Sequence, residues 1–309
     1  MRYLFTFALL CLSLLTFSQN KAYYVDAVIG NDNKNDGSIA QPWKTVSKTN
    51  TFNFKGGDVL YFAGGQTFGR LQLTKNDSGV TVKSYNGVAT LGGLTASNVG
   101  GITIDGLNFR GAGVTGNNDD GIFFYMDSSA ATDLENISIS NVTVTNFGAS
   151  GILIGAWGTD KGYNNVKVLN STLNNNGRDG FATYGYNDLV NHTNLYLYKV
   201  QAFRNYGRTD ITYTNTGSGI VVGSFDGGLV EYCEAYENGK NNRSYGGGPQ
   251  GLWCFNSRNI IFQYSTSHHN QAGKTVDGGG FDIDGGSQYC TIQYCYSYNN
   301  EGPGFAFFE

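Results

Sequence analysis

Three aspartates stand close together near the end of the 309-residue chain, in the segment TVDGGGFDIDGG at residues 275–286. Asp282 and Asp284 alternate with apolar residues as in a β-strand, so their side chains are predicted to project from one face. Cα atoms at such positions are about 6.6 Å apart, and carboxyl groups that splay further approach the roughly 6.5–9.5 Å separation of inverting glycosidases. Asp277 lies just upstream in a predicted turn. The three residues are therefore candidate catalytic acids and bases.

Aromatic side chains are predicted to flank this acidic pair. When the strands that follow a recurring glycine are aligned, Asp282 comes after Trp253 in one outward column and Asp284 comes after Phe255 in the next. Flat aromatic faces suit the stacking of pyranose rings, and carboxyl groups among aromatic rings tend toward the raised pKa that a general acid requires. The candidate substrate-binding residues are Trp253, Phe255, Tyr184 and Phe308.

Two other interpretations of the acidic residues stay open. Asp and Gly beside a strand are ordinary turn formers, so the segment can simply end a strand. An aspartate cluster can also hold an ion, which leaves Ca²⁺ open as a cofactor and the identity of any metal unknown. A second acidic turn, with Asp119 and Asp120, also precedes a Gly-Ile strand. It lacks the aromatic flanks and is the second candidate site.

The elements that must hold these residues come from an internal repeat. From Asn136 onward, blocks of about 30 residues each contain two short strands with alternating apolar residues, a polar turn, and a strand led by glycine. A period of about 20–50 residues indicates stacked units. Each block is interpreted as one coil of a stack.

Two columns of residues support this interpretation. One inward-pointing apolar residue is predicted after each recurring glycine, at Phe181, Ile220, Leu252, Phe281 and Phe305. Asparagine recurs three residues past the second strand of each coil, at Asn176, Asn205, Asn238, Asn270 and Asn300. Stacked carboxamides can bond to one another and to neighbouring main chain, so these asparagines are predicted to form a structural ladder.

The columns and the ladder together resemble the right-handed parallel β-helix proteins of the pectate-lyase-like superfamily, from about Gly57 to the end of the chain. The resemblance implies an all-β fold, a single-stranded right-handed parallel β-helix with a short N-terminal capping segment. Hydrolases of this superfamily carry aspartates just before and on a Gly-Ile strand, although their Asn-Thr-Asp and Gly-His-Gly motifs are absent here. Lyase relatives use an aspartate cluster for calcium and a Lys or Arg base, for which Lys274 and Arg243 are the candidates.

The two ends of the chain have distinct patterns. An apolar run at residues 4–17 follows Arg2, which is typical of a cleaved secretory signal, so residues 1–18 are predicted to be a signal peptide. Residues 19–56 are expected to lead in and cap the stack, with a short helix within 43–51, and residues 57–309 to form the β-helix. The chain stops inside a predicted strand, so we expect a β-helix truncated at its C-terminus.

Composition excludes several classes of protein. Gly and Asn number 45 and 34, which argues against a helical bundle or a doubly wound fold. Charged residues make up only 14% and the net charge is -4, so no basic stripe is available to bind nucleic acid or an anionic membrane. No second apolar stretch approaches membrane-spanning length.

Cysteine and histidine spacing match no zinc site. Cys11 leaves with the signal peptide, and the other four cysteines are predicted to be reduced and buried: Cys233, Cys254, Cys290 and Cys295. His268 and His269 end a predicted strand, where a solvated turn is the simplest interpretation and a helper role beside a carboxylate stays open.

These patterns favour an exported enzyme, a glycoside hydrolase or polysaccharide lyase, that acts on an extracellular polysaccharide laid along an outward face of the β-helix. The alternative is a non-catalytic carbohydrate-binding or adhesin β-helix, because the fold alone does not separate the two. In either case we expect a secreted or cell-surface monomer without a membrane span.

Overall fold

The computed structural model describes residues 20–308. The predicted signal peptide at residues 1–18 lies outside the described residues, as does Glu309. Within 20–308 the regular secondary structure is almost entirely β, with one short helix α1 (Val46–Thr49) and one 3₁₀ turn η1 (Lys75–Asp77). No helix in this part of the chain is long and apolar enough to cross a membrane.

The strands form three sheets in which every named pair is parallel. The first sheet contains, in spatial order, β1 (Ala22–Val25), β2 (Val59–Ala63), β5 (Thr81–Tyr85), β8 (Thr103–Asp105), β11 (Leu134–Ser140), β14 (Tyr163–Leu169), β17 (His192–Tyr198), β20 (Phe225–Glu231), β23 (Arg258–Gln263) and β26 (Thr291–Gln293). The second contains β4 (Leu71–Thr74), β7 (Leu94–Ser97), β10 (Ile122–Met126), β13 (Ile152–Ala156), β16 (Phe181–Tyr184), β19 (Ile220–Gly223), β22 (Leu252–Phe255), β25 (Phe281–Ile283) and β28 (Phe305–Phe307). The third contains β3 (Thr67–Phe68), β6 (Thr90–Leu91), β9 (Asn108–Arg110), β12 (Thr143–Thr145), β15 (Thr172–Asn174), β18 (Gln201–Phe203), β21 (Glu234–Tyr236), β24 (Thr266–His268) and β27 (Tyr296–Tyr298).

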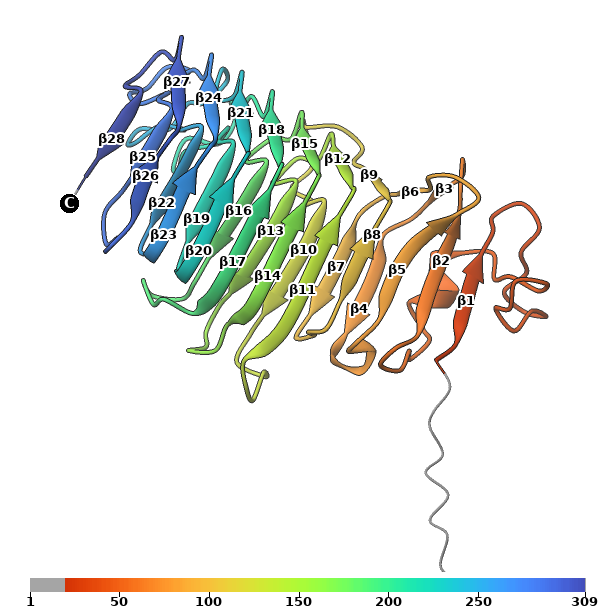
Figure 1. Cartoon of the computed structure of the whole chain (residues 1–309). Coiled ribbons are helices and arrows are strands. Elements are labelled where there is room, and N and C mark those ends of the chain that lie inside the picture. Colours follow the sequence, from red (N-terminus) through yellow and green to blue (C-terminus); the bar gives the residue numbers. More distant parts are fainter. Residues whose placement is uncertain (1–19, 309) are drawn as a thin grey trace, which may run out of the picture.

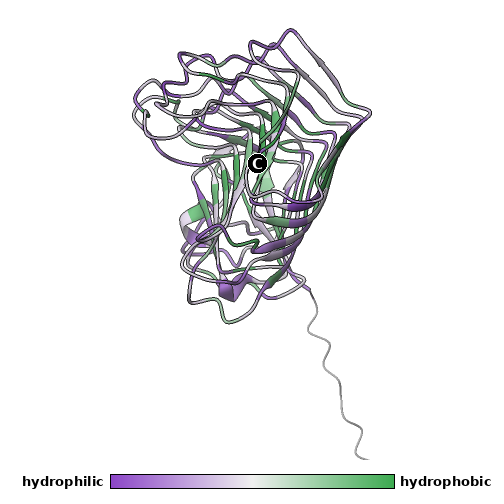
Figure 2. Cartoon of the chain, turned by 90° about the vertical axis from the view of Figure 1, so that its left-hand side faces the viewer, coloured by the Kyte–Doolittle hydropathy of each residue, from purple (hydrophilic) through white to green (hydrophobic). Residues whose placement is uncertain are grey.

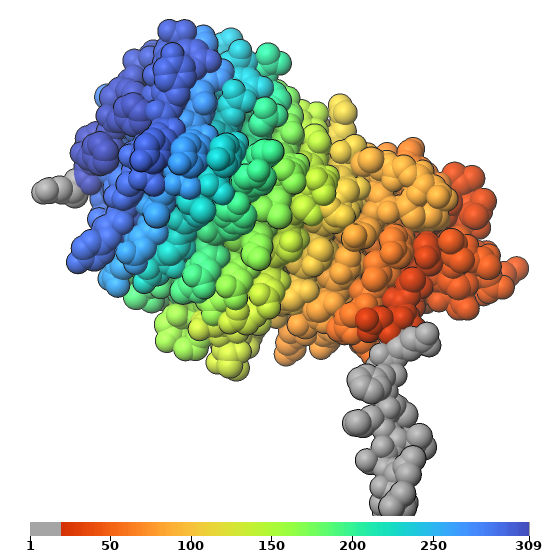
Figure 3. Space-filling model, viewed as in Figure 1, coloured from red at the N-terminus to blue at the C-terminus, as the bar shows by residue number. Residues whose placement is uncertain are grey.

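Each coil therefore contributes one strand to each sheet, and the next coil repeats the path one strand further along (Figure 1). The chain advances steadily from one end of the stack to the other, as the colour order of the space-filling view also shows (Figure 3). This confirms the predicted single-stranded right-handed parallel β-helix, whose handedness is the one that parallel crossovers adopt. The strand β1 already pairs with β2, so the first sheet begins within the predicted lead-in segment.

Apolar side chains fill the interior of the coils. Figure 2 colours the same strands by hydropathy, with hydrophobic and hydrophilic residues both present along them. The predicted glycine-led column is in register: Phe181 pairs with Ile220, Leu252 with Phe281, and Phe281 with Phe305. All but the last of these side chains are fully buried. Phe305 remains 45% exposed because it lies in the last coil of the described chain.

The predicted asparagine ladder is confirmed. The carboxamide of Asn205 donates through Nδ2 to Oδ1 of Asn238 at 3.1 Å, and Asn238 donates in the same way to Asn270 at 3.0 Å. Each backbone N–H also donates to the same carboxamide oxygen in the next coil. A third bond runs from each Nδ2 to a strand carbonyl, such as Asn238 to Ala202. The buried turn is thereby hydrogen-bonded at every coil.

Other asparagines are explained by backbone geometry. In each coil from Asn136 onward three turn positions have positive φ, a region that asparagine tolerates better than most residues. One such column begins with Asn141 and Asn170 and continues with Lys199, Tyr232, Tyr264 and Tyr294. The asparagine content thus serves the turns as well as the ladder.

The helix α1 lies inside the predicted cap at residues 43–51, as expected. The cysteine prediction is only partly right. All four described cysteines are free, and Cys233 and Cys254 are buried, but Cys290 and Cys295 are half-exposed. Both of these lie in the last described coil, which has a neighbouring coil on one side among residues 20–308, so the expectation of full burial was wrong.

Candidate functional site

The outward face of the second sheet has the predicted register. Val221 pairs with Trp253, Trp253 with Asp282, and Asp282 with Ala306. In the next outward column Gly223 pairs with Phe255. Asp282 therefore follows Trp253 by one coil on the same face of the sheet, whereas Asp284 lies just past the end of β25 (Phe281–Ile283).

Three long turns stand beside this face and build one wall over it. They connect the third sheet to the second in successive coils, at residues 204–219, 237–251 and 269–280. Arg208 anchors the first turn, since its guanidinium donates to the carbonyls of Asn117 and Gly148 and pairs with Asp210. Because these turns form a wall beside the sheet, the outward face of the second sheet becomes one side of a groove.

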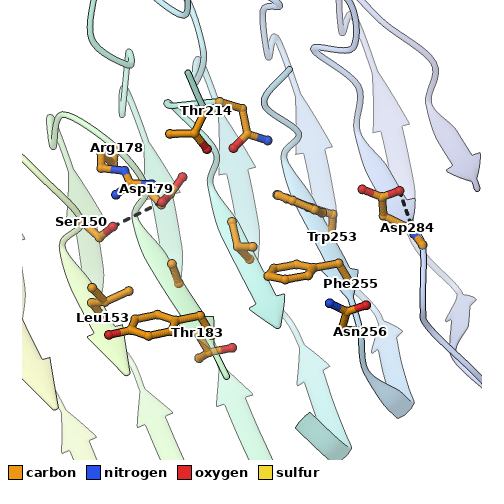
Figure 4. Close-up of a pocket in the computed structure, with 15 residues that line it drawn as sticks. Ser150, Leu153, Arg178, Asp179, Thr183, Thr214, Trp253, Phe255, Asn256 and Asp284 are labelled. Atoms are coloured by element: carbon orange, nitrogen blue, oxygen red, sulfur yellow. Dashed lines mark hydrogen bonds between the residues drawn. The ribbon is translucent and has the colours of Figure 1, made fainter. Parts of the chain in front are cut away.

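The groove consists of three adjoining cavities. The central cavity, of about 490 Å³, is lined by Tyr184, Val221, Trp253 and Phe255 among others (Figure 4). The acidic cavity, of about 270 Å³, is lined by Asp277, Asp282, Asp284 and Phe308 among others, and shares Trp253, Asp284 and Asn215 with the central one. The arginine cavity, of about 490 Å³, is lined by Asp120, Arg178, Arg208 and Tyr213 among others, and shares Leu153 and Arg178 with the central one.

Asp282 is buried although it lies on the outward side of its strand. Its side chain is 3% exposed, and Oδ2 accepts a hydrogen bond from Nε2 of Gln250 at 3.4 Å. The other oxygen, Oδ1, has no hydrogen-bond partner within the described part of the protein. Burial, followed by the negative charges of Asp284 and Asp277, raises the pKa of Asp282 to about 7. This carboxyl group is therefore substantially protonated near neutral pH.

The two other predicted acids lie beside it. Asp284 is half-buried, lines both the central and the acidic cavity, and accepts a hydrogen bond from the N–H of Gly285 at 2.7 Å. Asp277 has positive φ in the turn and accepts from the N–H of Gly248, which ties two wall turns together. The structure thus brings all three predicted carboxyl groups to one end of the groove.

The four predicted aromatic residues also line the groove. The Trp253 and Phe255 ring centroids are 5.4 Å apart, and the Trp253 indole donates to Oγ of Ser218 at 3.2 Å. Tyr184 lines the central cavity and Phe308 the acidic one. Trp253 is only 8% exposed, so most of its ring packs against other side chains although it lines two cavities.

Sequence reasoning missed a polar column beneath the groove. The residue just before each recurring glycine is polar in five successive coils, at Asp120, Ser150, Asp179, Ser218 and Gln250. Ser150 donates from its backbone N–H to Asp120 and from Oγ to Asp179, and Ser218 donates from its N–H to Asp179. The chain of bonds continues from the N–H of Gln250 to Ser218 and from Gln250 to Asp282. The recurring glycines were the available signal for this column.

The second-ranked acidic turn reaches the far end of the groove. Asp120 lines the arginine cavity, whereas Asp119 lines a separate hollow. Burial raises the pKa of Asp120 to about 6 against the opposing effects of the Ser150 N–H, Arg178 and Arg70. Burial also raises the pKa of Asp179, which comes close to Asp120 through Ser150.

Several candidates are not brought to the groove. Lys274 and Arg243 line none of the three cavities. His268 belongs to the third sheet, where its ring stacks between Tyr236 and Tyr298 at 5.0 and 4.7 Å. Among residues 20–308, no three His, Cys, Asp or Glu side chains are grouped closely enough to hold a metal ion, so calcium finds no such set of ligands there.

Comparison with known proteins finds relatives by structure alone. No family model matches the sequence, and no curated protein matches it significantly. Two structures of a GH136 lacto-N-biosidase from Eubacterium ramulus superpose with TM-scores of 0.72 and 0.69 at 18% identity, over 93% of this chain and 57% of theirs. Full-length tailspike protein 2 of the Escherichia coli O157:H7 bacteriophage CAB120 superposes with a TM-score of 0.52 at 15% identity, over 81% of this chain and 34% of its own.

These identities are too low to carry an activity across, and the chain spans about 57% of the lacto-N-biosidase. What the superpositions establish is the fold. The protein is a right-handed parallel β-helix, similar in architecture to a carbohydrate-active enzyme of known structure.

Proposed function

We propose that the protein is a glycoside hydrolase that cleaves a polysaccharide or oligosaccharide chain lying along the groove. The observation that carries this proposal is Asp282, a buried carboxyl group with a pKa near 7 and one unpartnered oxygen. Such a group holds a proton at neutral pH and can give it up, which is the property that a general acid needs. Asp284 stands two residues further along and lines the same cavity.

The proposed reaction uses the two carboxyl groups in different roles. Asp282 donates its proton to the glycosidic oxygen as the bond from that oxygen to the anomeric carbon breaks. Asp284 accepts a proton from the water that attacks the anomeric carbon. Asp284 follows Asp282 by two residues, just past the end of β25, which puts their Cα atoms about 6.6 Å apart in an extended chain. Carboxyl groups that splay further approach the roughly 6.5–9.5 Å separation that leaves room for that water in an inverting enzyme. Asp277 contributes negative charge that helps keep Asp282 protonated.

Hydrolysis is preferred to β-elimination because of the residues that line the acidic cavity. A lyase needs a base beside the sugar. Lyases of the pectate-lyase-like superfamily use a Lys or Arg side chain as that base, together with calcium held by aspartates. None of the residues found to line this cavity is Lys or Arg. The lining does contain the aromatic Trp253 and Phe308, which offer apolar surface to a sugar ring.

We further propose that the enzyme acts outside the cell as a monomer. The apolar run within residues 1–18 supports export. The low net charge and the scarcity of free cations in the groove support a carbohydrate rather than a nucleic acid as partner. A polysaccharide substrate outside the cell agrees with both features.

The test is a screen of the protein against a panel of polysaccharides, reading new reducing ends and unsaturated products together. The proposal expects reducing ends without unsaturated products. Asp282→Asn and Asp284→Asn are expected to cut turnover about a hundredfold or more. Asp160→Asn, in an exposed turn away from the groove, is the matched control and is expected to keep full activity.

Three outcomes contradict the proposal. Unsaturated products would establish a lyase. Saccharide binding without any cleavage would favour the non-catalytic carbohydrate-binding alternative. Full activity in both Asn variants would place the reacting group elsewhere, with Asp120 as the next candidate.

A further inference from the structure

Arg178 differs from Arg208, the other arginine that lines the groove, and from the nearby Arg70 in making no side-chain hydrogen bond within the described part of the chain, although its charge acts on the buried Asp120 and Asp179. It lines both the central and the arginine cavity, so it marks the point where the two adjoin (Figure 4). Its Nε is buried without a hydrogen bond, and no side-chain hydrogen bond or ion pair of Arg178 occurs within residues 20–308. Arg208 and Arg70, by contrast, donate to protein acceptors such as the carbonyls of Gly148 and Asp120.

The neighbouring carboxyl groups are already engaged with other donors. Asp179 accepts from Oγ of Ser150 at 3.2 Å and from the N–H of Ser218 at 3.3 Å. Asp120 accepts from the N–H of Ser150 at 2.8 Å. Arg178 is therefore a guanidinium group with free donors at a partly buried cavity edge. Such a group costs free energy unless a ligand supplies acceptors.

We propose that Arg178 is the centre of a distal subsite that binds the hydroxyl groups of a neutral sugar unit. The subsite rests on the proposed function, since it serves the same substrate chain that Asp282 would cleave. Arg178 donates to sugar oxygens, and Thr214 in the facing wall turn offers a hydroxyl to the same space.

The charges along the groove select the class of substrate. Six aspartates line the three cavities, and Arg178 and Arg208 are the arginines found there, with Arg208 paired to Asp210. Burial raises the pKa of Asp282, Asp120 and Asp179, so Asp277 and Asp284 at the acidic end carry the charge argument. A chain of uronate or sulfated units would bring its own negative charges close to these two carboxyl groups, which disfavours binding. Neutral hydroxyl groups accept from Arg178 and donate to carboxylates without this penalty.

The distance between the two ends sets the length of the substrate. Arg178 and Asp179 lie just before β16, and Asp282 lies in β25. The two strands are three coil steps apart, or roughly 14 Å at about 4.8 Å per step. One pyranose unit is about as long as one step. The subsite therefore contacts a unit about three positions away from the bond near Asp282, and shorter oligosaccharides do not reach it.

The experiment measures equilibrium binding by calorimetry in the Asp282→Asn background, in which turnover is expected to be about a hundredfold slower or more. The probes are neutral oligosaccharides of glucose, xylose, mannose and N-acetylglucosamine, from dimers to hexamers, with oligogalacturonate and oligomannuronate as charged counterparts. Arg178→Ala is expected to weaken binding of the longer neutral probes by about tenfold to a hundredfold, and to leave the dimers unchanged. Arg178→Lys should restore part of the loss. Arg258→Ala, on an exposed site of the first sheet, is the control.

Each outcome bears on the proposal. If Arg178→Ala weakens binding of short and long probes equally, or weakens neither, the subsite is overturned. The subsite is also overturned if no neutral probe binds the protein at all. Tighter binding of the uronate probes would overturn the neutral class. Length-dependent loss in Arg178→Ala without any cleavage by the wild-type protein would support the subsite and refute the hydrolase. Cleavage by the wild-type protein that is unchanged in Arg178→Ala would support the hydrolase and refute the subsite.

Discussion

Aromatic residues occupy two outward faces of the β-helix and behave differently on each. On the third sheet, Phe203, Tyr236, His268 and Tyr298 stack ring upon ring in successive coils, with centroids 4.7–5.0 Å apart and planes within 14°. On the second sheet, the column through Trp253 changes in type at every coil, from Val221 to Trp253 to Asp282 to Ala306. One face repeats itself and the other does not.

The contrast has a physical basis. When the same residue type recurs in successive coils, each side chain has a like side chain one coil away. Stacking or hydrogen bonding between the two then provides both with a partner. A side chain that interrupts a column has no such partner. Asp282 is left with an unpartnered oxygen, and Arg178 with an unpartnered Nε. Repetition along the stack therefore indicates a structural role, and interruption beside a cavity indicates a candidate for function.

The largest expected effect tests the repeated side. Asn238→Ala removes carboxamide bonds to Asn270 and Ala202. It also leaves the backbone N–H of Asn205 and one of the two carboxamide N–H groups of Asn205 unpaired in a buried turn. We expect the free energy of unfolding to fall by about 2–4 kcal/mol, measured by denaturant titration. Asn33→Ala, at an exposed position, should change it by less than about 0.5 kcal/mol. Equal changes in the free energy of unfolding for the two variants would mean that the asparagine ladder does not stabilise the fold.

A crossed pair of aromatic variants sharpens the comparison. Trp253→Ala should weaken saccharide binding about tenfold, while Tyr236→Ala should leave binding unchanged and lower the unfolding free energy by about 1–2 kcal/mol. Trp253→Phe keeps a ring and controls for loss of packing. Binding by calorimetry and stability by denaturant titration give the two readouts. Weaker binding in Tyr236→Ala would break the distinction between the faces.

The smallest expected effect is on stability as a function of pH. Burial raises the pKa of Asp282 to about 7 in the folded protein, so the folded state holds this proton more tightly than the unfolded chain does. Its contribution to stability is full below the ordinary pKa and is lost as pH rises through about 7. Asp282→Asn cannot ionise, so its Tm should exceed that of the wild type by roughly 2–6 °C near pH 8.

This pH-dependent gain should disappear at acid pH, where both side chains are neutral. Asp160→Asn is the control, with no gain expected at any pH, because that residue lies in an exposed turn. Thermal unfolding across a pH series measures both. A gain in Asp282→Asn that stays constant at acid pH would mean that charge at Asp282 is not its cause.

The repeated features could be predicted from the sequence, and the interruptions only in part. A period near 30 residues placed Asn238 in a ladder, Phe281 in the core and Asp282 outward beside Trp253. Three wall turns of unequal length carry no period. The sequence therefore predicted a raised pKa from neighbouring aromatic rings, but not the contact from Gln250 or the near-complete burial of Asp282. Tertiary folding of these turns produced the raised pKa.

Arg178 was missed for a related reason. It precedes a recurring glycine by two positions, where the residue type varies from coil to coil, and its role depends on a cavity that the turn at residues 204–219 closes. The column of Asp179, Ser218 and Gln250 was more accessible, because each residue lies directly before a glycine that the repeat had already identified.

The most direct test of the account is the pH dependence of kcat/KM on the best substrate that the screen yields. If Asp282 is the general acid, kcat/KM should fall about tenfold per pH unit above an apparent pKa near 7. Asp282→Asn should lose this limb together with most of its activity, while Asp160→Asn keeps both. A profile that is flat through neutral pH, or a basic limb that persists unchanged in Asp282→Asn, would contradict the assignment of Asp282 as the proton donor.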